Sequence, residues 1–123
     1  MTRILVIDDD KPTRELVTRI LGRAGHDVSQ AGNGKEGLDR LTSAQPTIVI
    51  TDVFMPDKDG VETIIALRKV HPGIKIIAMS GGGRVGNLDF LQLAEQVGAD
   101  KVLQKPIRMS DLLEGVKSLA ATA

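Results

Sequence analysis

The segment Thr47-Ile48-Val49-Ile50-Thr51-Asp52 is an apolar run of strand length that ends on a carboxylate. A second run, Ile4-Leu5-Val6-Ile7, leads in the same way into Asp8, Asp9 and Asp10. A strand that is apolar on both faces can solvate a carboxylate only at its end. Two such strands therefore predict several carboxylates at one edge of a sheet. Like charges repel at short range, so this cluster requires a cation, shifted pKa values, or both.

The rest of the chain alternates between strand-like and helix-like patterns. Short runs rich in β-branched residues, and two more polar runs, predict five strands: 4–7, 28–31, 48–50, 74–79 and 101–104. Apolar residues at helical spacing predict four helices, near residues 16–24, 61–67, 90–97 and 112–119. A weaker helix at 35–43 begins behind Asn33, which is a candidate N-cap.

Five strands that alternate with five helices predict an α/β fold, with a parallel sheet covered on both faces. The first, third and fourth strands are the most apolar and should be central, while the second and fifth should lie at the edges. This matches the flavodoxin-like (βα)5 three-layer sandwich with strand order 2-1-3-4-5. Ligands of such sheets bind beyond the carboxyl ends of the strands. Five polar residues fall at or just past those ends: Asp8, Asp9, Asp52, Ser80 and Lys105.

Composition limits the classes of function. The 123 residues suit a single domain, 1–123, and show no linker, repeat or second domain. The 16 basic and 16 acidic residues balance, which argues against autonomous binding to nucleic acid or to an anionic membrane. There is no cysteine, and no apolar segment has the length of a signal peptide or a membrane span. We therefore expect a cytoplasmic protein.

The polar residues at the strand ends suit phosphoryl transfer. Carboxylates at adjacent strand ends provide the oxygen ligands that Mg²⁺ prefers. A carboxylate such as Asp52 can also attack phosphorus and form an aspartyl phosphate. The ammonium group of Lys105 and a metal ion would then offset the charge of the transferring group, and the Ser80 hydroxyl could donate a hydrogen bond to it.

Five signatures, in order along the whole chain, resemble the landmarks of response-regulator receiver domains from two-component signalling: Val6-Ile7-Asp8-Asp9, Thr51-Asp52-Val53-Phe54-Met55-Pro56 with Asp59-Gly60, Met79-Ser80, Gly98-Ala99-Asp100 and Lys105-Pro106. The resemblance implies that Asp52 accepts phosphate from a phosphohistidine, on a sensor histidine kinase or a histidine phosphotransfer protein. It also implies a Mg²⁺ ion held by Asp8, Asp9, Asp52 and the backbone carbonyl of Phe54.

The resemblance gives two further residues a role and suggests an output. Ser80 and Lys105 would contact the phosphoryl group, and the Lys105–Pro106 peptide bond would be cis. Their movement would repack the surface formed by helix four, strand five and helix five, which shifts a pre-existing conformational equilibrium. Val102 stands where most receivers have Tyr or Phe, so the usual aromatic readout is not expected. The glycine-rich segment 81–86 follows Ser80 directly.

We expect a stand-alone receiver that passes its signal by protein contact or passes its phosphate to another histidine. Such a protein is not an enzyme, beyond catalysing its own phosphorylation and autodephosphorylation. Two alternatives remain open. A phosphatase similar to haloacid dehalogenases would use Asp8 and Asp10 as its first motif, although Pro12 stands where that motif has Thr or Val. A pseudo-receiver would keep the fold as a docking module without being phosphorylated.

Overall fold

The computed structural model describes residues 2–53, 60–80, 84–85, 88–89, 95–96 and 98–122. Along the chain it contains these elements: β1 (Arg3–Ile7), α1 (Lys11–Arg23), β2 (Asp27–Ala31), α2 (Gly34–Ala44), β3 (Ile48–Asp52), α3 (Gly60–Val70), β4 (Lys75–Ser80), β5 (Arg84–Val85), β6 (Leu88–Asp89), β7 (Lys101–Gln104) and α5 (Met109–Thr122). The predicted alternation is confirmed for the five strands of the main sheet and for the helices α1, α2, α3 and α5, whereas the helix predicted near 90–97 lies mostly outside the described residues.

Five strands form one sheet in the order β2-β1-β3-β4-β7, and every neighbouring pair is parallel. This is the predicted order 2-1-3-4-5, because β7 is the fifth strand of this sheet. The central strands β1, β3 and β4 are almost wholly buried, whereas β2 and β7 at the edges are mostly half-buried. The position of each strand therefore follows its apolar content.

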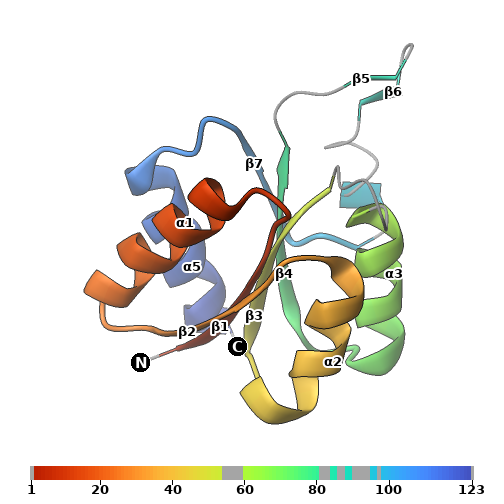
Figure 1. Cartoon of the computed structure of the whole chain (residues 1–123), viewed down its shortest axis with the longest axis horizontal. Helices are drawn as coiled ribbons and strands as arrows, with labels where there is room; N and C mark the ends of the chain where they lie inside the picture. Colours follow the sequence, from red (N-terminus) through yellow and green to blue (C-terminus); the bar gives the residue numbers. More distant parts are fainter. Residues whose placement is uncertain are drawn as a thin grey trace.

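Alternate side chains of the central strands pack into two separate cores. Figure 1 shows α1 and α5 on one side of the sheet and α2 and α3 on the other. Leu5 and Val49 point to the face covered by α2 and α3, where Ile64 packs against them. Val6 and Ile50 point to the opposite face, which α1 and α5 cover. Burying each such side chain stabilises the fold by roughly 1.5–3 kcal/mol. The result is the predicted three-layer sandwich.

The first two helices, α1 and α2, each carry a capping side chain at the N-terminus. The Asp10 carboxylate accepts a hydrogen bond from the Thr13 amide at the start of α1. The Asn33 side chain accepts from the Glu36 amide at 2.8 Å, which confirms Asn33 as the N-cap of α2. Such caps typically contribute about 1 kcal/mol.

Several predictions fall on residues that the structure does not describe. Phe54, segment 55–59 and most of segment 81–86 lie outside the described residues, as does most of the helix predicted near 90–97. Residues 95 and 96 of that helix are helical. The sequence did not predict the antiparallel pairing of β5 with β6.

Candidate functional site

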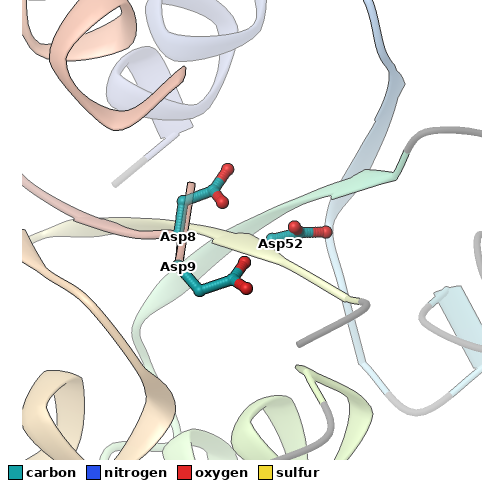
Figure 2. A group of neighbouring side chains, drawn as sticks. All are labelled: Asp8, Asp9 and Asp52. Carbon is teal, nitrogen blue, oxygen red and sulfur yellow. The ribbon is translucent and has the colours of Figure 1, made fainter. Parts of the chain in front are cut away.

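Three carboxylates meet at the carboxyl edge of the sheet, as the sequence predicted. Asp8 and Asp9 follow the last residue of β1, and Asp52 is the last residue of β3. One carboxylate oxygen from each residue lies within 4.8 Å of the other two. Figure 2 shows the three side chains leaving these neighbouring strand ends together. Asp8 and Asp52 are buried, whereas Asp9 is exposed.

The ammonium group of Lys105 bridges two of these carboxylates. Lys105 follows the end of β7, and its Nζ lies 2.9 Å from Asp8 Oδ2 and 3.2 Å from Asp52 Oδ2. Desolvation by burial acts to lower the pKa of Lys105, but the hydrogen bond to Asp8 and the negative charges of Asp52 and Asp8 outweigh it, so the pKa is raised. The lysine is therefore charged at neutral pH. The Lys105–Pro106 bond is cis, as predicted.

Ser80 brings a buried hydroxyl to the same edge of the sheet. It ends β4, next to β3, and its backbone carbonyl accepts a hydrogen bond from the Lys105 amide at 2.7 Å. Among the described residues, the Ser80 hydroxyl has no hydrogen-bond partner. A buried polar group without a partner costs about 1–3 kcal/mol. The site therefore contains a donor that a bound oxyanion would satisfy.

The turn that carries Asp8 and Asp9 is held by several hydrogen bonds. The Asp8 amide donates to the carbonyl of Ala31 on β2 at 3.1 Å. Asp8 Oδ1 accepts from the Asp10 amide at 2.9 Å. The guanidinium group of Arg14 donates to the Asp8 carbonyl, also at 2.9 Å. Sequence reasoning missed Arg14, although a long basic side chain in the first turn after an acid cluster is a signal that could have found it.

The donor set fits a hard divalent cation. Asp8, Asp9 and Asp52 supply oxygen ligands only, and they are the sole such cluster of acidic, His or Cys residues among the residues described. Mg²⁺ binds through one or two carboxylates together with water and phosphate oxygens. The fourth predicted ligand, the carbonyl of Phe54, lies outside the described residues. A cation at this position would also relieve the repulsion among the three acids.

Comparison with known proteins identifies the family. The model of the response regulator receiver domain matches residues 4–117, which is most of the chain. The chain belongs to the response regulator receiver domain family. It is accordingly a receiver domain of the two-component response regulators. This assignment decides against the phosphatase similar to haloacid dehalogenases.

Individual relatives of this receiver domain differ in length. Response regulator MprA of Mycolicibacterium vanbaalenii is 36% identical over 121 residues, which are 95% of this chain but 49% of MprA. Sporulation initiation phosphotransferase F of Bacillus subtilis is 30% identical over 115 residues, 94% of this chain and 90% of that protein. The receiver thus spans about half of the first relative and nearly all of the second.

Solved structures agree with the fold of the receiver. The chemotaxis protein CheY4 of Vibrio cholerae superposes with a TM-score of 0.86 at 28% identity, covering 97% of this chain and 98% of that one. A CheY-like receiver domain protein from Methanospirillum hungatei gives a TM-score of 0.88 at 30% identity, covering 98% and 95%. In the described part of this receiver, no helix is both long enough and apolar enough to span a membrane.

Proposed function

We propose that Asp52 is the phosphoacceptor of this receiver and that the whole chain, 1–123, acts as one phosphorylation-dependent signalling domain. Asp8, Asp9, Asp52 and the Phe54 carbonyl would hold Mg²⁺. The observation that carries the proposal is the meeting of three carboxylates with the Lys105 ammonium group at the end of the sheet. That combination supplies a nucleophile, a cation site and a fixed positive charge in one place.

Asp52 is better suited than Asp8 to attack phosphorus. Asp8 is fully buried, whereas Asp52 retains slight exposure at the end of its strand. Asp52 is therefore the acid that an incoming phosphohistidine can reach, and Asp8 is assigned to metal binding.

The reaction transfers one phosphoryl group. An oxygen of Asp52 forms a bond to phosphorus as the bond between phosphorus and the histidine nitrogen breaks. Bound Mg²⁺ would neutralise part of the charge on the transferring group. Lys105 lies close enough to Asp52 to pair with the new negative charge, and the unpaired Ser80 hydroxyl can donate to a phosphoryl oxygen. The product carries roughly −1.5 to −2 charges near neutral pH.

The change in charge can reach the output surface through the backbone. The Lys105 amide donates a hydrogen bond to the Ser80 carbonyl, which links the ends of β4 and β7. Val102, two residues before the end of β7, packs against the core on the α2 and α3 face. We infer that the surface formed by the helix predicted near 90–97, β7 and α5 changes its packing, with Val102 filling space rather than swinging between rotamers.

The partners proposed for the receiver are of two kinds. A sensor histidine kinase or a histidine phosphotransfer protein would supply the phosphoryl group, and an unknown downstream protein would bind the altered surface. The relative named as a phosphotransferase supports a role in phosphate relay. The receiver would act in the cytoplasm, without binding nucleic acid or membrane, and would catalyse only its own phosphorylation and autodephosphorylation.

Intact mass spectrometry after incubation with acetyl phosphate and Mg²⁺ tests this function. We expect one phosphoryl adduct on the wild type and none on Asp52→Asn or on the wild type in EDTA. Asp39→Asn is a matched control, because Asp39 is exposed on α2 and should still label. An adduct lost in Asp8→Asn but kept in Asp52→Asn would make Asp8 the nucleophile. A wild type that binds neither acetyl phosphate nor beryllofluoride would be a docking module.

A further inference from the structure

Arg14 lies beside the acid cluster without belonging to it. Its position in the first turns of α1 lets the side chain reach back over the end of β1. There Nη1 donates to the carbonyl of Asp8 at 2.9 Å, and Nε donates to Oε1 of Gln30 on β2 at 3.0 Å. Two donor atoms of one planar group are therefore fixed by two acceptors, one just after β1 and one on β2, an arrangement that the single nitrogen of an ammonium group could not reproduce.

The hydrogen bond from Arg14 is accepted by the carbonyl of the peptide group that joins Asp8 to Asp9. Among the described residues, the Asp9 carboxylate has no hydrogen bond or ion pair of its own. Asp9 is also exposed, so no packing holds its side chain. Its direction is set by the backbone on either side. The Asp8 carboxylate accepts a hydrogen bond from the Asp10 amide on the C-terminal side of Asp9, and Arg14 donates to the Asp8 carbonyl on the N-terminal side.

We propose that Arg14 is a positioning residue, which fixes the peptide between Asp8 and Asp9 and thereby aims the Asp9 carboxylate at the divalent cation. This inference rests on the proposed function, since it requires that the acid cluster bind Mg²⁺. Groups that orient metal ligands in this way commonly change metal affinity by 10- to 100-fold when they are removed.

Charge and geometry predict opposite effects for the loss of Arg14. A guanidinium group near a cation site repels the cation, so removing its charge alone should tighten Mg²⁺ binding. Losing its hydrogen bond frees the peptide and should weaken Mg²⁺ binding. The sign of the change therefore separates a positioning role from a purely electrostatic one.

Isothermal titration calorimetry with Mg²⁺ distinguishes the positioning role from the purely electrostatic role. Arg14→Met removes both donor atoms, whereas Arg14→Lys retains one donor atom and the positive charge. Arg19→Met is the control, because Arg19 is an exposed arginine on the same helix. We expect the dissociation constant of Arg14→Met to rise on the order of 10-fold, with partial recovery in Arg14→Lys and no loss of affinity in Arg19→Met. Circular dichroism in EDTA confirms that each variant is folded.

A second measurement does not depend on metal. The Asp9 amide belongs to the same peptide group whose carbonyl accepts from Arg14, so its amide resonance in EDTA should shift in both Arg14 variants and stay in place in Arg19→Met. This comparison holds for Arg14→Lys even where Arg14→Met fails to fold. Mg²⁺ binding by Arg14→Met as tight as the wild type, or an unmoved Asp9 resonance, overturns the inference. A wild type that does not bind Mg²⁺ overturns the proposed function as well.

Discussion

Replacing Asp9 by Asn should make the metal-free protein more stable. The substitution keeps the shape of an exposed side chain but removes one of three negative charges that lie within 4.8 Å of each other. At that separation, Coulomb's law gives each pair of unit charges about 1 kcal/mol in water and about 3.5 kcal/mol at an effective dielectric constant of about 20. Asp9 faces two like charges and one lysine, so roughly one repulsion remains uncompensated.

The expected gain in the free energy of unfolding of Asp9→Asn follows from these Coulomb energies. Because Asp9 is exposed, its interactions lie toward the weaker limit, and we expect Asp9→Asn to raise the free energy of unfolding by about 1–2 kcal/mol in EDTA. The gain should shrink in high salt, which screens exposed charges. Mg²⁺ should reverse the order, since a ligand stabilises the folded state by about 2.7 kcal/mol at 100 times its dissociation constant and the wild type binds it more tightly.

Urea unfolding followed by circular dichroism measures this, because the chain has no Trp or Tyr for fluorescence. The experiment compares the wild type, Asp9→Asn and Asp39→Asn in EDTA, at low and high ionic strength, and then with Mg²⁺. Asp39→Asn makes the same change of charge on an exposed helix position away from the cluster. If Asp9→Asn is no more stable than Asp39→Asn in EDTA, then repulsion among the three acids is not a significant term and the electrostatic reasoning for the site is wrong.

Three other substitutions test separate parts of the structure. The pKa of Lys105 is raised in the folded state, so the stability from its ion pairs is fully present below the ordinary lysine pKa of 10.5 and is lost as pH rises through the higher folded-state pKa. The free energy of unfolding should therefore fall more steeply above about pH 10.5 in the wild type than in Lys105→Gln. Equal slopes in the two proteins would contradict this. Ser80→Ala removes a buried hydroxyl without a partner, so the free energy of unfolding without metal should stay level or rise by about 1 kcal/mol. The phosphoryl adduct in intact mass spectra should form more slowly. A large loss of stability would mean that the hydroxyl has a hydrogen-bond partner. Gly37→Ala should lower the free energy of unfolding by about 1–3 kcal/mol in urea titrations, because a Cβ on Gly37 would clash with Cδ1 of Ile7. Ile7→Val in the same chain removes that methyl group and should recover part of the loss.

The sheet could be predicted from the sequence because its strands differ in burial. Residues 48–50 are apolar at every position, which only a central strand of a covered sheet accommodates, while the mixed runs at 28–31 and 101–104 suit edges. The joining of Asp52 and Lys105 followed from topology alone, since parallel strands end at one edge. The short β5–β6 pair carries no such signal, because two residues per strand are too few to form an apolar run of strand length.

The site could be predicted by residue type but not by hydrogen bonding. The sequence indicates that Ser80 ends a strand, yet whether its hydroxyl has a partner depends on which neighbouring groups lie within about 3 Å. Arg14 shows the same limit. Its spacing from Asp8 is visible in the sequence. The direction of its side chain, which has several rotatable bonds, depends on the hydrogen bond to Gln30 on β2, and the sequence does not show that contact.

Asp8 connects these separate parts of the site. Its two carboxylate oxygens and its backbone carbonyl accept hydrogen bonds from the Asp10 amide, Lys105 and Arg14, and its amide donates to Ala31. Each of these hydrogen bonds joins Asp8 to a different part of the chain. One buried residue therefore contacts the turn after β1, the ends of β2 and β7, and α1. Because Lys105 Nζ also contacts Asp52, any change in the charge of Asp52 alters the balance of forces on Asp8. The residue that holds the site together is thus distinct from the residue proposed to react. Substitutions of Asp8 should disturb folding as well as metal binding, whereas those of Asp52 should remove the nucleophile together with one proposed metal ligand.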